Sequence, residues 1–269
     1  MKPMLRSRAA LRITRLSIFR AAVISALVLC LAPVASAGKR PFTWVWDAEV
    51  LREGEVELEQ WLWSKRNTQM HIGYIWFAPV IGVTNQLELA FPWEIMGGSG
   101  TPMKMANMAG EVRYLWTNPL TEGRRFHFLT RGFLQQNFND GRDGRNTGPL
   151  DTTQWWGLNL VTAYGDLNGS HVTLDLGHMM DLGPTEHWLR IATASLGYVH
   201  RVRRGLLLGG EVFFERGLPG YKEQLNNLMA GPVINVFHKN YWITVGALTG
   251  VRKDQDTLFM PRFMFGVTL

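Results

Sequence analysis

Charged side chains at every second position of otherwise apolar segments are the part of this sequence that could do chemistry. Glu55, Glu57 and Glu59 share one side of an extended chain with Trp61 and Trp63, whereas on a helix the three carboxylates would point in different directions. Such a row can bind cations or bias the passage of charged molecules. Eight acidic and three basic residues interrupt the apolar segments in this way: Glu55, Glu57, Glu59, Glu88, Glu111, Asp175, Glu211, Glu215, Arg113, Arg131 and Arg262.

The patterns that would assign catalysis or metal binding do not occur in the sequence. His171 and His178 are an odd number of residues apart, so on a strand they would face opposite sides at a separation of about 23 Å, at roughly 3.3 Å per residue. The motifs HExxH, CxxC, GxSxG and GxGxxG are absent, and Gly97-Gly98-Ser99-Gly100 is typical of a flexible loop. We therefore expect no catalytic residue, no metal ion and no cofactor.

The start of the chain has the three-part organisation of a secretory signal peptide. A basic stretch ending at Arg20 precedes an apolar run from Ala21 to Leu31 and the small-residue site Ala35-Ser36-Ala37. The apolar run is shorter than the roughly 20 residues that cross a bilayer as a helix. We expect export with cleavage after Ala37, which divides the chain into a signal peptide (1–37), a periplasmic or lumenal segment (38–54) and a main domain (55–269).

The net positive charge of the chain comes from this leader. Six of the 28 Lys and Arg residues precede residue 38 and no Asp or Glu does, so 22 basic residues remain against 22 acidic ones. A chain balanced in this way gives no reason to expect a nucleic-acid partner. Cys30, the only cysteine, also lies in the leader. Cys30 leaves open the alternative of a lipid-modified cysteine. Lipoprotein signals resemble one another in having a small residue directly before that cysteine, whereas this chain has Leu29 there.

The end of the chain is its most regular amphipathic segment. Phe263, Phe265, Val267 and Leu269 fall on one face of an extended strand, and Arg262 falls on the other. An unpaired strand edge invites aggregation, whereas the last strand of a closed barrel pairs with the first. This segment is similar to the carboxy-terminal signal read by the bacterial barrel-assembly machinery, which usually ends in Phe. We expect that machinery and outer-membrane lipids as partners.

After residue 54, segments of strand length in which apolar and polar residues alternate recur along the whole chain. The expected strands begin at Glu55 and continue over 70–78, 84–93, 106–117, 125–137, 153–164, 170–180, 188–200, 205–215, 224–237, 241–251 and 258–269. The pattern predicts an all-β fold, an antiparallel up-and-down transmembrane β-barrel of about twelve strands, with ten or fourteen as alternatives. The two longest connections, 94–106 and 138–152, would lie on the same side, as the outer loops of such barrels do.

A soluble β-sandwich is the alternative that also shows alternation. The expected strands are longer than the typical 5 or 6 residues. Tryptophans near strand ends further favour the barrel, since aromatic girdles lie at both membrane interfaces. Eight tryptophans lie at or near an expected strand end: Trp61, Trp63, Trp93, Trp116, Trp155, Trp156, Trp188 and Trp242.

Charges on barrel strands are expected to face the lumen, because a Lys or Arg against lipid at mid-bilayer costs about 2 to 4 kcal/mol. The excess of carboxylates predicts a preference for cations or neutral solutes. In the alternative, the charges pair across the lumen and stabilise a narrow, nearly closed barrel. The expected lumen-lining residues are Glu57, Glu59, Glu88, Glu111, Arg113, Arg131, Asp175, Glu211, Glu215 and Arg262.

Short motifs near the start of the expected domain carry a family resemblance. They are Arg40-Pro41-Phe42-Thr43 with Asp47-Ala48-Glu49, the run from Gly54 to Glu59, the run from Gly82 to Leu89 and, further on, Gly209-Gly210-Glu211-Val212. These runs resemble the opening of the transporter-like barrels labelled "MetA-pathway of phenol degradation". The resemblance implies an outer-membrane barrel that passes small hydrophobic or aromatic molecules, and it implies no set of binding residues.

These observations together predict an outer-membrane channel or carrier for passive diffusion of a small solute, with the connections 94–106 and 138–152 as candidate gates. A structural or adhesion barrel with a plugged lumen is the alternative. A lipid-modifying enzyme is the more remote alternative. It would need a Ser and a His side by side on the outer face, and Ser170, His171 and Ser195 do not resemble the motif of outer-membrane phospholipases.

Overall fold

The computed structural model describes residues 40–66, 71–98, 101–117, 125–138, 154–182, 190–218, 225–253 and 255–269. Within these ranges the ordered elements are β-strands, and no helix is long and apolar enough to cross a membrane. The strands are β1 (Val56–Arg66), β2 (His71–Gly82), β3 (Leu87–Ala90), β4 (Trp93–Gly98), β5 (Thr101–Leu115), β6 (Phe126–Asn137), β7 (Gln154–Gly165), β8 (His171–Asp181), β9 (Arg190–Arg203), β10 (Leu206–Gly217), β11 (Asn226–His238), β12 (Tyr241–Gly250) and β13 (Phe259–Thr268).

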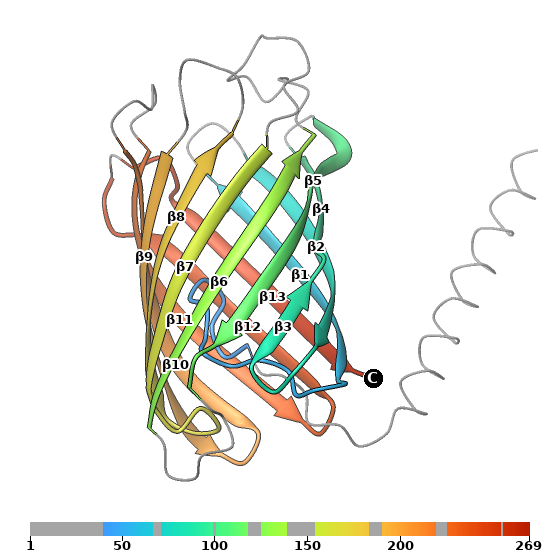
Figure 1. Cartoon of the computed structure of the whole chain (residues 1–269). Coiled ribbons are helices and arrows are strands. Elements are labelled where there is room, and N and C mark those ends of the chain that lie inside the picture. Colours follow the sequence, from blue (N-terminus) through green and yellow to red (C-terminus); the bar gives the residue numbers. More distant parts are fainter. Residues whose placement is uncertain are drawn as a thin grey trace, which may run out of the picture.

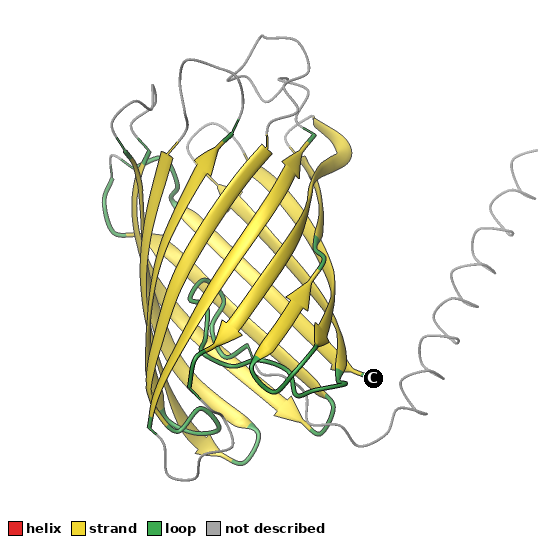
Figure 2. Ribbon diagram, in the orientation of Figure 1, coloured by secondary structure: helices red, strands yellow, loops and turns green. Residues whose placement is uncertain are grey.

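The strands form one antiparallel sheet that closes on itself (Figures 1 and 2). Apart from β3 and β4, which each pair with β2 and β5, the strands pair with their neighbours in sequence, and β1 pairs with both β2 and β13. The short strands β3 and β4 share one position between β2 and β5, so the barrel has twelve strands. The closed sheet confirms the barrel and excludes two stacked sheets.

The closing strand joins the two ends of the sheet as its alternation predicts. Glu57 pairs with Thr268, and the register continues without a break to Trp63 opposite Arg262. On the outside of this strand Phe263 and Leu269 are exposed, whereas Arg262 is buried in the lumen. Phe265 is partly buried and Val267, also on the odd positions, is buried.

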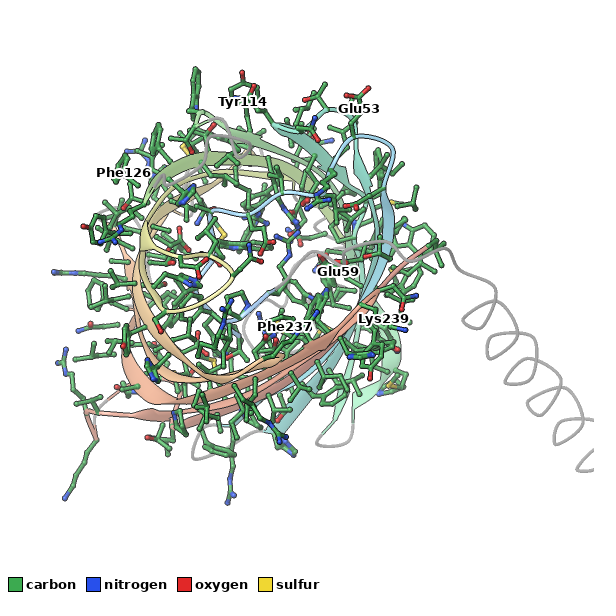
Figure 3. All side chains as sticks on the ribbon, turned by 90° about the horizontal axis from the view of Figure 1, so that it is seen from below. Glu53, Glu59, Tyr114, Phe126, Phe237 and Lys239 are labelled. Carbon is green, nitrogen blue, oxygen red and sulfur yellow. The ribbon has the colours of Figure 1, made fainter. Side chains whose placement is uncertain are left out.

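The alternation also holds on the opposite wall. Leu158 and Leu160 of β7, like Leu174 and Leu176 of β8, are more than 40% exposed on the outer surface, and the polar residues between them are buried. A strand has only two faces, so a continuous apolar exterior forces the intervening side chains into the lumen. Figure 3 shows the resulting ring of side chains, with Glu59 inside and Tyr114 and Phe126 outside.

The prediction of a loop, and of a candidate gate, at residues 94–106 is wrong. Residues Trp93–Gly98 and Thr101–Leu115 are strands β4 and β5, which extend well beyond the expected bounds. The interruption comes earlier, at Phe91 and Pro92, because proline has no N–H for the ladder. The N–H of Phe91 donates to the carbonyl of Pro79, at 3.1 Å, so the break stays attached to β2. The second candidate gate, 138–152, lies outside the described residues from 139 onward.

Candidate functional site

The N-terminal segment before β1 lies inside the barrel, and we call residues 40–52 the plug. In Figure 1 this blue segment lies within the lower half of the barrel, and Figure 3 shows it crossing the lumen. Phe42 packs against Val199 and Leu207 on one wall, and Ala48 and Leu51 belong to separate buried clusters on other walls. The plug therefore contacts the barrel on several sides.

Glycines on the inner wall leave room for the plug. A Cβ on Gly197 would lie 2.4 Å from the ring of Phe42, and one on Gly246 would lie 2.7 Å from the hydroxyl of Thr43. Distances below 3.0 Å do not occur for real Cβ atoms without a shift of the neighbour. Larger residues at these two positions would displace the plug.

Arg40 anchors the first end of the plug to two buried glutamates. Its guanidinium donates to Glu59 at 3.0 Å and to Glu88 at 2.8 Å. Glu88 also accepts from the N–H of Leu51, at 2.7 Å, and forms an ion pair with Arg113. Because these groups are buried, each charge depends on its partners in place of water.

Glu211 binds the backbone of the plug. Its carboxylate accepts hydrogen bonds from the N–H groups of Thr43 at 3.0 Å, Trp44 at 2.7 Å and Val45 at 3.2 Å, and from the hydroxyl of Thr43. Three successive amides around one carboxylate form a concave anion site. The buried charge of Glu211 is thus stabilised by the plug itself.

Asp47 forms the third polar anchor. It lies 3.1 Å from the imidazole of His171 and accepts a hydrogen bond from the hydroxyl of Thr173 at 2.9 Å. Burial alone would raise the pKa of this carboxyl, but the charge and hydrogen bond of His171, together with bonds from Thr173 and Ala48, outweigh burial and lower the pKa of Asp47. Asp47 is therefore held as a carboxylate.

Two tryptophans of the plug stack on arginines of the wall. The guanidinium of Arg131 lies 4.0 Å from the ring centre of Trp46, and Arg113 lies 4.7 Å from it. Arg262 lies 3.4 Å from the ring centre of Trp44 and donates to the carbonyl of Thr43 at 2.6 Å. Cation–π contacts of this kind contribute about 2 kcal/mol when desolvated.

A cavity of about 330 Å³ lies against these tryptophans in the lumen. Five tryptophans line it: Trp44, Trp46, Trp61, Trp63 and Trp76. Polar groups converge on the same space. Glu94 accepts hydrogen bonds from the indole N–H of Trp63, at 3.0 Å, and from the amide of Asn107, at 2.7 Å. A concave pocket that combines aromatic walls with convergent polar groups can hold a small molecule.

The sequence-predicted charged residues divide into two groups within the lumen. Glu57, Glu59, Glu88, Arg113 and Glu211 are buried and are absent from the lining of the cavity. The second group lines the cavity: Glu111, Arg131, Asp175, Glu215 and Arg262.

Glu55, the first acidic residue of the alternating series, lies before β1 and accepts a hydrogen bond from the N–H of Arg52. It belongs to the turn that leads out of the plug, where the strand alternation has not yet begun.

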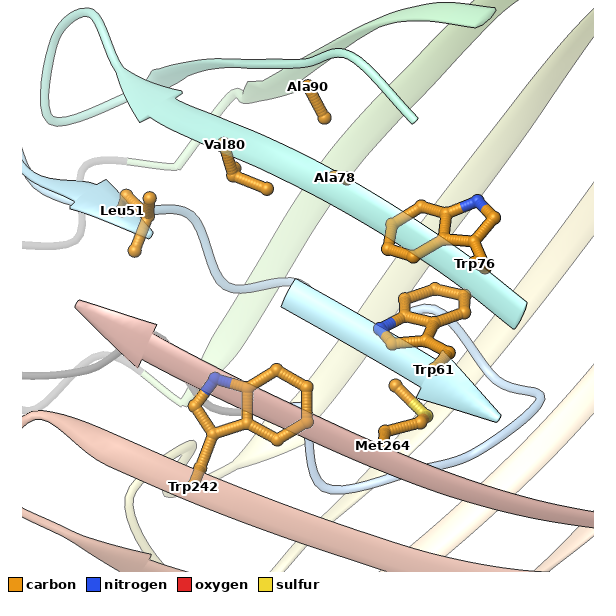
Figure 4. Packing of buried hydrophobic residues seen from close by; sticks show 8 residues of the cluster. All are labelled: Leu51, Trp61, Trp76, Ala78, Val80, Ala90, Trp242 and Met264. Carbon is orange, nitrogen blue, oxygen red and sulfur yellow. The ribbon is translucent and has the colours of Figure 1, made fainter. Parts of the chain in front are cut away.

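Some of the tryptophans expected in membrane girdles lie inside the barrel, and Trp188 lies outside the described residues. Trp61 and Trp242 are buried in one cluster inside the barrel (Figure 4), and Trp61 stacks on Trp76 with ring centres 3.9 Å apart. Trp93 and Trp116 are exposed outside, as the girdle interpretation requires. The girdle interpretation is therefore wrong for the inner tryptophans. Whether a side chain faces the lumen or the lipid depends on its position in the alternation of the strand, and closeness to a strand end does not decide it.

Sequence reasoning allowed residues 38–54 to lie in the periplasm or in the lumen, but it did not identify the contacts that the plug makes. Arg40, Thr43, Trp44, Trp46 and Asp47 all make contacts with the wall. Their segment shows no alternation, so strand periodicity gave it no place. Glycines at inward-facing positions, such as Gly197 and Gly246, could have indicated the plug, because they leave space in the lumen that another segment can fill.

Fold and lumen together define a porin-like outer-membrane β-barrel with an internal plug. No protein-family model matches the sequence, and no curated protein matches it. Among the described residues no group of three or more His, Cys, Asp or Glu side chains could hold a metal ion.

Solved structures match the fold over most of the chain. The COG4313 outer membrane channel from Pseudomonas putida F1 is 12% identical, with a TM-score of 0.56 over 85% of this chain and 100% of that one. The NanC porin is 8% identical, with a TM-score of 0.53 over 79% of this chain and 98% of that one. The KdgM porin in complex with disordered oligogalacturonate is 10% identical over 80% of this chain and 97% of that one, with a TM-score of 0.48. At these identities the likeness concerns the fold.

Proposed function

We propose that this protein is an outer-membrane channel for passive diffusion of a small solute that carries an aromatic or apolar part. The observation that supports it best is the lumenal cavity of about 330 Å³ lined by five tryptophans. Its volume falls in the range of small-molecule sites, roughly 300 to 1,000 Å³. The family resemblance of the N-terminal motifs implies the same class of solute.

The charged groups that line the cavity indicate which net charge the solute can carry. Glu94, Glu111, Asp175 and Glu215 line the cavity together with only two arginines, Arg131 and Arg262. An excess of carboxylates disfavours anions in a narrow pore. Neutral aromatic molecules, or cations with an aromatic ring, are therefore the preferred solutes.

Biogenesis of the proposed channel follows from the sequence. Export would remove residues 1–37 and leave the plug two residues from the new N-terminus. The closing strand, Phe259–Thr268, would be recognised by the barrel-assembly machinery, and the apolar exterior would contact outer-membrane lipids.

A barrel that serves as a structural or adhesion protein is the second candidate. The plug supports it, because Arg40, Asp47 and Trp46 tie the segment to the wall by buried contacts. In this case no solute would cross, and the connections between strands would carry the function.

Liposome swelling separates the two candidates. For the channel we expect flux of neutral aromatic solutes, faster than that of sugars of similar size, and a slower aromatic flux in Trp76→Ala, which removes a cavity wall. Trp116→Ala is the matched control, because Trp116 is exposed on the outer surface. Absence of flux for every solute would exclude the channel and favour the plugged barrel.

A further inference from the structure

An apolar groove of about 660 Å³ crosses the outer face of the barrel. Small residues and prolines contributed by six neighbouring strands form its floor: Pro232, Ala247, Pro261, Ser64, Gly73 and Gly97. Register places them in one row, because Ala247 pairs with Pro261, Ser64 with Gly73, and Gly73 with Gly97. The next row of larger residues, which includes Phe263, Leu62 and Ile75, forms one side of the groove.

The seam between β1 and β13 is interrupted at this groove. Pairing runs from Glu57–Thr268 to Trp63–Arg262 and resumes only at Arg66–Phe259. By antiparallel register, Ser64 and Lys65 stand opposite Pro261 and Met260 in the interruption. Proline lacks the N–H that the ladder needs. The wall is thus held together less tightly here than along the rest of the seam.

The same part of the wall separates the groove from the lumenal cavity. Trp63 and Arg262 line both spaces, since they occupy the paired position next to the interruption. Arg262 is also bound to the plug, through the carbonyl of Thr43 and the ring of Trp44. The plug crosses the lumen (Figure 3), and its Trp44 and Trp46 line the cavity together with Trp63 and Arg262 of the wall, so the cavity lies between the plug and this part of the wall.

We infer that the seam between β1 and β13 at Pro261 is a lateral exit, through which an uncharged apolar or aromatic solute passes from the cavity into the surrounding hydrocarbon along the groove. This inference rests on the proposed function, because it assigns a route to the same solute. Arg262 is the gating side chain, and its contacts with the plug hold it in the closed position. An apolar solute loses nothing by leaving into lipid, whereas a charged solute would pay the cost of desolvation.

A disulfide across the interruption tests the exit. Lys65→Cys with Met260→Cys places two thiols on opposite residues of adjacent strands, whose Cα separation of about 4.5–5.5 Å suits a disulfide. The native chain adds no other thiol outside the leader, where Cys30 lies. The control pair is Leu58→Cys with Val267→Cys, which joins the same two strands at a paired position away from the groove.

The measurement is the entry of N-phenylnaphthylamine, a dye that fluoresces in membrane lipid, into cells whose outer membrane excludes it. We expect the oxidised 65/260 pair to lose this uptake, reduction to restore it, and the 58/267 pair to take up dye in both states. Pro261→Val, which restores a ladder donor, should slow uptake without any cross-link. Equal uptake by the oxidised and reduced 65/260 pair would overturn the lateral exit while leaving the channel intact. A different result would overturn the proposed function, and the exit with it: cells with the native protein take up no dye, and liposomes with the native protein show no flux of a neutral aromatic solute.

Discussion

At the scale of single residues, the buried carboxylates of the lumen are stabilised by partners that come from far along the chain. Glu211 receives the amides of residues 43–45, and Glu88 receives the guanidinium of Arg40. Removing one partner of a buried charge costs about 3–5 kcal/mol, because the other partner remains uncompensated. The wall and the plug therefore stabilise each other, and a change at one contact should loosen the other.

Glu211→Gln should release the plug without disturbing the barrel. Glutamine keeps the shape of the side chain but replaces charged hydrogen bonds, which contribute about 1.5–3 kcal/mol each, by neutral ones. A loss of that size raises the population of undocked plug by roughly tenfold to a hundredfold.

Single-channel recording in planar bilayers measures the effect as more frequent open events. Glu215→Gln is the control, because Glu215 lies on the same strand and accepts a hydrogen bond from Asn227 of β11. Equal open probability in the Glu211 variant and the native protein would contradict the anchoring role of Glu211.

At the scale of the strands, the outer face is defined by apolar side chains whose tolerance of charge depends on depth. Leu196 lies in the middle of β9, and Val202 lies near its end, and both are exposed. A Lys or Arg on the lipid face costs about 2–4 kcal/mol at the midplane and about 0–1 near the interface.

Leu196→Arg should therefore lower the free energy of unfolding by about 2–4 kcal/mol, and Val202→Arg by less than about 1 kcal/mol. Denaturant titration of the protein refolded in lipid vesicles gives both values. If the two variants lost the same stability, the exterior of β9 would not be in contact with hydrocarbon, and the transmembrane interpretation of the strands would be wrong.

At the scale of the whole molecule, the plug crosses the lumen (Figure 3) and supplies partners for charged groups of the wall. Arg40 comes from the plug, whereas its partners Glu59 and Glu88 belong to the wall. With the plug in place Arg40 compensates the charges of Glu59 and Glu88. Without the plug Arg113 would be the remaining arginine partner of Glu59 and Glu88, so two carboxylates would share one cation.

Deletion of residues 40–52 should raise the single-channel conductance and increase the preference for cations. The deletion removes the segment that crosses the lumen, and it removes Arg40 from Glu59. Reversal potentials under a salt gradient measure the selectivity. The double replacement of Glu59 and Glu88 by Gln in the deletion background is the control, and it should abolish the added cation preference. A deletion variant with native conductance would show that the plug does not limit flux.

The strands were predictable because alternation is a local property of the chain. The expected ranges 125–137, 153–164 and 241–251 differ from β6, β7 and β12 by one residue at one or both ends. The error at 94–106 came from glycine and proline in a strand, which local rules assign to loops. Here Gly98 belongs to β4 and Pro102 to β5, because β4 pairs with both β2 and β5 in this part of the sheet.

The lumen could be predicted only as far as which side chains enter it. Register sends Glu88, Glu111 and Arg131 inward, and their sequence positions alone give that direction. Their partners could not be predicted, because Arg40 is separated from Glu88 by 48 residues and Thr43 from Glu211 by 168. Contacts at such separations depend on closure of the barrel and on the entry of the plug.

The sequence by itself determined which side chains of each strand share an apolar face and which share a charged face, and so favoured a barrel in a membrane, because a strand has two faces and hydrocarbon accepts only the apolar one. Only the tertiary structure decided that the N-terminal segment occupies the lumen, that tryptophans of plug and wall enclose a cavity, and that Pro261 interrupts the seam beside it. These features arise where segments distant in sequence meet, and no periodicity within a single segment encodes such a meeting.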